Sequence, residues 1–236
     1  MRLQLLFSGR IRPLGAPVPA YLIQTGDATV LVDTGPPRDR AGAHRADPDE
    51  RVVLEPGEDV PALLGRLGVA PDDVDVVVCT HLDPDHAGNH DVFAGAEFVV
   101  QRSHHAWAVS AAGARRAAAR AAWDRPGVRW TLVDGDTELL PGIELIESGG
   151  HVPGHQSVLV RLPETGPVLL AADAIPMKAA LDPENRPIFP FDMDEAQVRA
   201  STKKLVDLAR AEGAMIICGH EPANLTELRA APAFYG

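Results

Sequence analysis

The sequence has little of several residue types, and each shortage excludes a class of protein. Its 236 residues contain only two cysteines, so a small secreted scaffold held together by disulfides is excluded. Lysine and arginine total 22 against 33 aspartates and glutamates, which gives a formal net charge of −11. A nucleic-acid-binding surface needs clustered cations that release counterions. We therefore expect no nucleic-acid partner.

Long apolar runs are also missing. No stretch approaches the roughly 18 to 20 apolar residues that a membrane span requires. The opening residues, Met-Arg-Leu-Gln-Leu-Leu-Phe, are too short for the core of a signal peptide. We expect no membrane partner and a cytoplasmic location. There Cys79 and Cys218 are predicted to be buried reduced thiols, although the sequence alone leaves a disulfide between them open.

Apolar residues are frequent enough for one large core. They make up 45% of the chain, which suits a single domain over residues 1–236. Strands are expected near 2–7, 20–24, 28–33, 74–79, 97–101, 129–133, 143–147, 156–162, 167–172 and 214–218. Helices are expected near 59–68, 104–123 and 194–212.

The order of these elements predicts an α/β fold. Strands interleaved with helices indicate two sheets packed face to face with helices outside, in four layers. The polar stretch 36–58 is expected to be a long loop near the opening of the site. Asp192 or Asp194 is expected to cap the last helix.

Four possible metal ligands stand within six positions directly after an apolar strand. Thr80 to Asn89 read Thr-His-Leu-Asp-Pro-Asp-His-Ala-Gly-Asn, which contains His81, Asp83, Asp85 and His86. Buried imidazoles and carboxylates are costly unless they are paired, protonated or bound to a cation. A metal centre removes that cost; a capped turn with satisfied polar groups is the alternative.

Further candidate ligands follow other predicted strands, and they are His151, Asp173 and His220. Binding residues concentrate on loops that leave a rigid scaffold, so we expect these side chains to gather with the first cluster. His155 is interpreted as a residue that orients a ligand loop. Asp33, in an Asp-Thr-Gly turn, is expected to brace the ligand loop by accepting backbone hydrogen bonds.

The remaining histidines are interpreted as surface or loop residues: His44, His90, His104 and His105. Among them His90 follows the first cluster most closely and is the candidate for contact with substrate.

These motifs resemble, in order and spacing, those of the metallo-β-lactamase superfamily across nearly the whole chain. The resemblance is carried by Asp33-Thr-Gly35, His81-x-Asp83-x-Asp85-His86, Gly150-His151, Asp173 and Gly219-His220. Within the superfamily, Thr80 to Asn89, Pro141 to Glu144 and Gly150 to Ser157 are similar to the N-acyl homoserine lactonases. The resemblance implies an αββα sandwich of two mixed sheets and hydrolysis of an ester, thioester or lactone. A lactone is the expected small-molecule substrate, and a homodimer is a possible assembly.

The resemblance also implies two divalent metal ions and a ligand set. The first metal would be held by His81, Asp83, His151 and Asp173. The second would be held by Asp85, His86, His220 and the shared Asp173. Asp85, His86 and Asp173 are further expected to act in catalysis. Two metals about 3.5 to 4 Å apart can hold a bridging hydroxide and polarise a carbonyl.

Asp83 is the main departure from the family, which usually has histidine there. An anionic ligand lowers the charge of the centre by one unit and weakens it as a Lewis acid, by up to roughly 4 kcal/mol at an effective dielectric near 20. Zinc is the first expectation, with iron or manganese as alternatives because oxygen ligands favour them. A second departure is Pro176, where homoserine lactonases carry a tyrosine that helps to orient the substrate carbonyl.

Asp83 leaves two other functions open. The flavodiiron proteins carry glutamate at this position, so a non-haem diiron redox or oxygen-activating protein of the same fold is one alternative. The chain is too short to include their flavodoxin domain and has no matching Gly-rich flavin segment. A metal-binding relative with altered or lost hydrolysis is the other alternative, based on Asp83 and Pro176.

Overall fold

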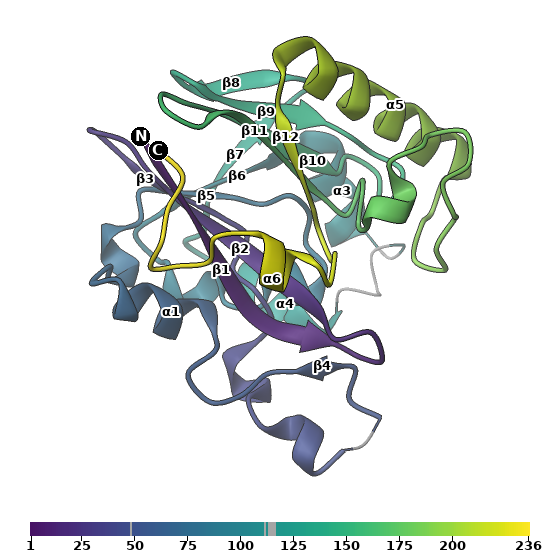
Figure 1. The fold of residues 1–236 in the computed structure, drawn as a ribbon. Coiled ribbons are helices and arrows are strands. Elements are labelled where there is room, and N and C mark those ends of the chain that lie inside the picture. The colour runs from purple at the N-terminus through teal and green to yellow at the C-terminus, as the bar shows by residue number, and fades with distance from the viewer. Residues whose placement is uncertain (48, 111, 113–116) are drawn as a thin grey trace.

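The computed structural model describes residues 1–47, 49–110, 112 and 117–236, and two sheets form its centre (Figure 1). The strands of the larger sheet are β1 (Arg2–Ile11), β2 (Ala16–Gln24), β3 (Thr29–Val32), β4 (Val52–Val53), β5 (Val76–Val78), β6 (Glu97–Gln101) and β7 (Arg129–Val133). Its strand order is β4-β1-β2-β3-β5-β6-β7.

The smaller sheet contains β8 (Thr137–Leu140), β9 (Ile143–Glu147), β10 (Gln156–Leu162), β11 (Gly166–Ala172) and β12 (Met215–Cys218). Its order is β12-β11-β10-β9-β8. The helices are α1 (Val60–Arg66), α2 (Pro84–Ala87), α3 (Arg102–Val109), α4 (Ala117–Trp123), α5 (Glu195–Glu212) and α6 (Asn224–Glu227). None of the described helices is long and apolar enough to cross a membrane.

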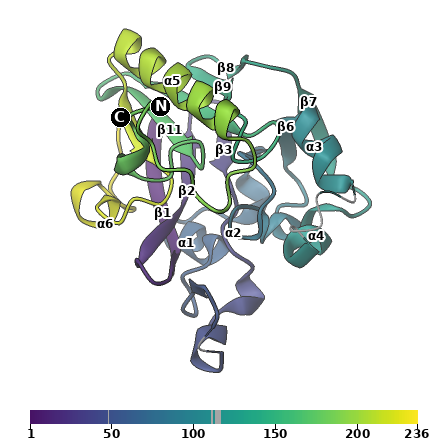
Figure 2. The same ribbon diagram turned by 90° about the vertical axis from the view of Figure 1, so that its right-hand side faces the viewer.

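Alternate residues of the buried strands face different apolar layers, and this alternation produces the four layers. In β10, Val158 and Val160 lie between the two sheets, whereas Leu159 packs in the layer under α5. In β3, Leu31 packs in the layer that contains α1, α3 and α4, and its neighbours face the other sheet. Side chains along a strand point to opposite faces in turn, and both faces here are covered. The predicted αββα sandwich is confirmed, with α5 over the smaller sheet (Figure 2).

Parallel pairing brings several strand ends to one edge. The pairs β3–β5, β5–β6 and β6–β7 are parallel in the larger sheet, and β11–β12 are parallel in the smaller. Asp33 follows β3, His81 follows β5, Asp173 follows β11 and His220 follows β12. The two packed sheets therefore deliver residues that are distant in sequence to the same place.

Most expected elements are present, with several differences. The short helices α2 and α6 were not expected. The helix expected over 104–123 corresponds to the two helices α3 and α4, and residues 111 and 113–116 lie outside the described part. The stretch 36–58 contains β4, which pairs with the end of β1. The edge strand β8 was not expected, because it is short and partly exposed and is held by backbone pairing with β9. Asp194, not Asp192, caps α5 by accepting from the amide of Gln197 at 2.9 Å.

Leu170 tests the packing between the sheets, because it is fully buried there. We expect Leu170→Ala to lower the free energy of unfolding by about 2 to 5 kcal/mol, since apolar burial is lost and a cavity remains. Chemical denaturation of chelator-treated protein measures the change. Leu14, which is 63% exposed, supplies the control: Leu14→Ala should change the value by less than about 0.5 kcal/mol. Equal changes in the two variants would contradict the assigned packing.

Candidate metal centre

Four buried histidine rings converge where the strands end. The ring centroids of His81 and His86 are 4.1 Å apart, those of His81 and His151 4.9 Å, and those of His86 and His220 5.4 Å. None of the four residues is more than 7% exposed. Local sequence explains part of this arrangement: Pro84 opens α2 directly after the strand-end loop, so that the short helix carries both Asp85 and His86.

Asp33 holds the rings of His81 and His86 through their Nδ1 atoms, directly for His86 and through Thr80 for His81. Its Oδ1 accepts from the amide of Thr80 at 2.8 Å, and its Oδ2 accepts from the Thr80 hydroxyl at 2.7 Å and from Nδ1 of His86 at 2.8 Å. The Thr80 hydroxyl in turn accepts from Nδ1 of His81 at 3.0 Å. Both rings are thus held with Nε2 facing inward, and Asp33 braces the ligand loop as expected.

The other two histidines have similar outer partners. Nδ1 of His220 donates to the carbonyl of Pro17 at 2.9 Å, and Nδ1 of His151 lies 3.7 Å from Oδ1 of Asp192. A partner on Nδ1 sets the ring orientation and leaves Nε2 for the interior of the cluster, which is the usual arrangement around metal-binding imidazoles.

Asp173 lies between the histidines. Its Oδ1 is 3.0 Å from Nε2 of His220 and 3.4 Å from Nε2 of His86, and its Oδ2 is 3.5 Å from Nε2 of His151. Its side chain is buried, which by itself would raise its pKa, but the surrounding histidines His220, His86 and His151 hold the pKa well below its usual range. Asp173 is therefore an anion at neutral pH.

Asp83 and Asp85 lie on opposite sides of the cluster. Oδ2 of Asp83 is 3.4 Å from Nε2 of His151, and Oδ2 of Asp85 is 3.7 Å from Nε2 of His86. Potential ligand atoms lie within 4.8 Å of one another in each of three groups: His81, Asp83 and His151; Asp85, His86 and His220; and His81, His86 and Asp173. The structure brings all seven candidate residues together in the grouping implied by the resemblance. Their roles as ligands stay a prediction.

The donor set fits divalent cations. Within the described ranges, Nε2 of His81 and Nε2 of His86 are buried and make no hydrogen bond. Burial lowers the pKa of His86, but the carboxylates of Asp85, Asp173 and Asp33 outweigh it and raise that pKa well above the ordinary value. Imidazole nitrogens and carboxylate oxygens are the ligands that zinc, iron and manganese take, and a bound cation would replace the proton that the carboxylates favour on His86.

His155 and His104 connect the ligand loops. Nε2 of His155 accepts from the amide of Asp173 at 3.2 Å, and its Nδ1 donates to the hydroxyl of Ser148 at 2.9 Å, which agrees with its interpretation as an orienting residue. Nε2 of His104 accepts from the amide of Leu82 at 2.9 Å, and its Nδ1 donates to the carbonyl of Pro153 at 2.8 Å. His104 thereby joins the loop after β5 to the loop after β9.

The expectation of surface histidines was wrong for two residues, because His104 and His90 are fully buried. His90 lies between Thr34, at 2.9 Å from its Nδ1, and Cys79, at 3.1 Å from its Nε2. It therefore packs behind the Asp33 turn and is closed to substrate. Cys79 and Cys218 are buried free thiols, as predicted. The sequence offered no local signal for His104, and Asp192 was considered only as a helix cap.

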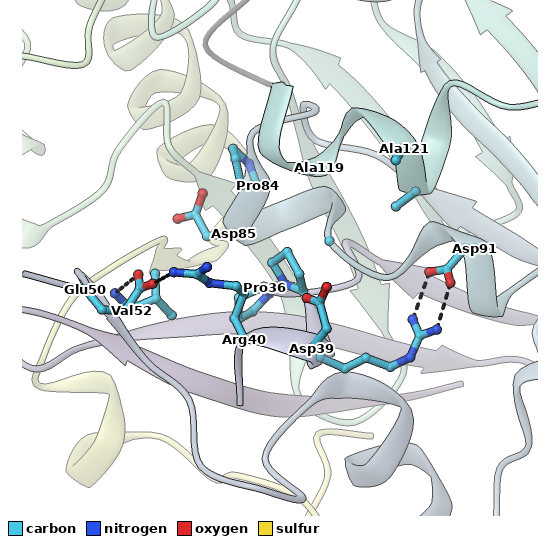
Figure 3. A pocket seen from close by; sticks show the side chains of 14 residues that line it. Pro36, Asp39, Arg40, Glu50, Val52, Pro84, Asp85, Asp91, Ala119 and Ala121 are labelled. Carbon is cyan, nitrogen blue, oxygen red and sulfur yellow. Dashed lines mark hydrogen bonds and ion pairs between the residues drawn. The ribbon is translucent and has the colours of Figure 1, made fainter. Parts of the chain in front are cut away.

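A pocket of about 690 Å³ opens beside Asp85 (Figure 3). Prolines and alanines, including Pro36, Pro84 and Ala121, give it apolar walls, and ion pairs of Arg40 with Glu50 and of Arg38 with Asp91 lie along its sides. Several of these residues belong to the stretch 36–58, which lies at the opening of the site as expected.

Comparison with known families decides the classification. The metallo-β-lactamase superfamily matches residues 14–220. The chain belongs to this superfamily. An N-acyl homoserine lactonase of Bacillus thuringiensis is 31% identical over 227 residues, covering 94% of the chain and 88% of the relative. The N-acyl homoserine lactonase AttM of Azorhizobium caulinodans is 36% identical over 194 residues, covering 78% and 72%.

The solved structures agree with this assignment. A structure described as N-acyl homoserine lactone hydrolase with the product N-hexanoyl-L-homoserine bound at the catalytic metal centre superposes with a TM-score of 0.87 at 27% identity, covering 99% of this chain and 98% of that one. The resemblance to the lactonase group is confirmed, and the chain is a metallo-β-lactamase superfamily hydrolase.

Metal binding should compete with protons at His151. Burial lowers the pKa of this ring, but Asp173, Asp192 and Asp83 outweigh it and raise the pKa from 6.5 to about 9. The proton on His151 therefore stabilises the metal-free fold fully below about pH 6.5, and this contribution is lost as the pH rises through about 9.

A metal ion needs the neutral ring, so we expect zinc affinity to rise between about pH 6.5 and 9 while the metal-free protein loses stability. Competition against a chromophoric chelator measures the affinity, and calorimetry in buffers of different ionisation enthalpy counts the released protons. An affinity independent of pH over this interval would contradict the assignment.

Proposed function

We propose that the protein is a binuclear metal-dependent hydrolase of lactones, with N-acyl homoserine lactones as the substrate class. One observation carries the proposal: two groups of three potential ligands lie at the ends of the strands, and Asp173 lies between them, 3.0 Å from Nε2 of His220 and 3.5 Å from Nε2 of His151. The names of the sequence relatives, which are 31% and 36% identical, support this substrate class. Zinc is the metal proposed first.

The residues have separable tasks in this reaction. Bound cations supply polarisation of the carbonyl and activation of water. Asp85, whose side chain is 23% exposed and lines the pocket, is the ligand most accessible to substrate. We assign the Asp85 carboxylate to accept the proton that the attacking water gives up and to pass it to the ring oxygen. Water adds to the carbonyl carbon, the ring C–O bond breaks, and the product is a hydroxy acid.

The pocket beside Asp85 is the proposed place for the acyl part of the substrate. Its apolar walls suit an alkyl chain, and its ion pairs hold the stretch 36–58 in place. Pro176 supplies no hydroxyl to orient the carbonyl; its own carbonyl accepts from the amide of His220 at 2.6 Å. We therefore assign the orientation of the substrate to contacts with the residues that line the pocket.

The proposal is tested with metal analysis and a panel of substrates. We expect two metal equivalents and hydrolysis of N-acyl homoserine lactones, with the rate depending on acyl-chain length. His81→Ala removes a ligand and should abolish hydrolysis. His105→Ala is the matched control, because His105 packs on Trp130, away from the cluster, and should retain activity. A purified protein that contains no metal, or a His81→Ala variant with full activity, would contradict the proposal.

Asp83 supports iron or manganese as alternative metals and a diiron redox function as the second candidate. Its carboxylate lies in the group with His81 and His151. Elemental analysis separates these cases. Iron with a visible absorbance change on reduction would favour the redox function, and colourless zinc-loaded protein would favour hydrolysis. A metal-binding relative with lost hydrolysis would hold metal and leave every lactone of the panel intact.

Asp83→His tests the effect of the extra negative charge. A neutral ligand makes the centre a stronger Lewis acid, so the pKa of an activated water falls on the order of one to a few units. We expect the pH profile of kcat for Asp83→His to shift to lower pH than that of the wild type. Superimposable profiles would show that the charge of Asp83 does not tune the reaction.

A further inference from the structure

Arg186 and Asp192 form a fully buried ion pair next to the metal centre. Nη2 of Arg186 is 3.1 Å from Oδ2 of Asp192, and both side chains are 0% exposed. Burying an ion pair costs several kcal/mol per ion before the pair's own attraction is counted, and apolar residues of similar size often serve stability equally well. Stability alone is therefore a weak explanation for this pair.

Asp192 reaches the metal centre through His151. Its Oδ2 accepts from Arg186 and from the amide of Phe189 at 2.9 Å, which fixes the carboxylate. Its other oxygen, Oδ1, lies 3.7 Å from Nδ1 of His151. Phe191 packs edge-on against the same imidazole, with ring centroids 5.5 Å apart. The turn 189–192 thus contacts the His151 ring from outside the cluster.

Arg186 connects this turn to two other elements. Its Nη1 donates to the carbonyl of Ala174 at 2.8 Å and to the hydroxyl of Thr202 on α5 at 2.7 Å. Ala174 directly follows Asp173, so the guanidinium holds the backbone next to the shared carboxylate. One side chain therefore links the outer partner of His151 to the chain that carries Asp173.

The loop that carries His151 leaves little room for adjustment. The carbonyl of Gly150 accepts from the amides of Met193 and Asp194, both at 2.9 Å. Gly150 has a φ of +122°, and a Cβ there would lie 2.3 Å from the amide nitrogen of Val198. The backbone of this loop packs tightly against the start of α5. With the backbone fixed, the residues that face Nδ1 of His151 determine the orientation of its ring.

We propose that Arg186 and Asp192 are positioning residues that orient His151 and hold the backbone beside Asp173, and thereby set the metal affinity of the His81, Asp83 and His151 group. The proposal rests on the proposed binding of metal by this group. Loss of an outer partner of a ligating histidine weakens metal binding 10- to 100-fold in general. A purely structural pair would leave the affinity unchanged.

The test replaces the pair by apolar residues of similar size. In the Arg186→Met/Asp192→Leu variant, the metal-free protein should stay folded because no charge is left buried alone, but it should lose some resistance to denaturant because Ala174, Thr202 and Phe189 lose hydrogen-bond partners. Its affinity for zinc, measured by competition with a chromophoric chelator, should fall about 10- to 100-fold at one of two sites and stay unchanged at the other. Lys203→Ala, which removes an exposed pair with Asp207 on α5, is the control and should change neither quantity.

The conservative variant Asp192→Asn keeps the test decisive if the double variant does not fold. Its amide keeps a polar group beside the His151 ring but removes the negative charge, so we expect zinc affinity between those of the wild type and the double variant. Wild-type affinity would overturn the inference. A folded double variant with wild-type zinc affinity would also overturn it. These results leave the proposed function intact, whereas a wild-type protein that binds none of zinc, iron and manganese overturns both.

Discussion

Seven ionisable side chains meet at one end of the two sheets. Burying them away from water costs free energy, and the rest of the site depends on how that cost is offset. Among the described residues, Nε2 of His81 and Nε2 of His86 are buried there without a hydrogen-bond partner. Bound cations remove this cost. Asp33 accepts hydrogen bonds from the Thr80 hydroxyl and from Nδ1 of His86. These bonds fix the ring orientation, so that the inward-facing Nε2 atoms stay placed to bind metal.

The fold supplies the geometry that this constraint requires. Parallel strands in both sheets end at the same edge, and the apolar layer between the sheets keeps the two edges in register. Buried cross-connections then tie the loops together. His104 joins the loops that carry His81 and His151, and His155 holds the amide of Asp173. A rigid scaffold with loops fixed at several points preorganises a binding site before any ligand arrives.

The sequence predicted the sandwich and the seven clustered residues because these depend on local patterns. Strand alternation places residues between layers, and motifs after strands place side chains at an edge. His104, Arg186 and Asp192 were not predicted as part of the site because their partners are distant in the chain. A histidine on a helix and an arginine in a loop look like surface residues until folding buries them against Leu82, Pro153 and Ala174. The edge strand β8 similarly depends on its pairing with β9.

Charge balance connects Asp83 to the buried ion pair. Asp192 adds a negative charge near His151, but Arg186 neutralises it at 3.1 Å and in a buried setting where the attraction is weakly screened. The pair therefore adds no net charge beside the centre, although Asp192 itself, 3.7 Å from Nδ1 of His151, helps to raise the pKa of that ring. The carboxylate of Asp83 lies beside the histidines of the cluster, 3.7 Å from Nε2 of His81 and 3.4 Å from Nε2 of His151. If Asp83 binds metal as proposed, its charge acts directly on the centre, and Asp83 is then the position at which the sequence would lower the Lewis acidity of the site.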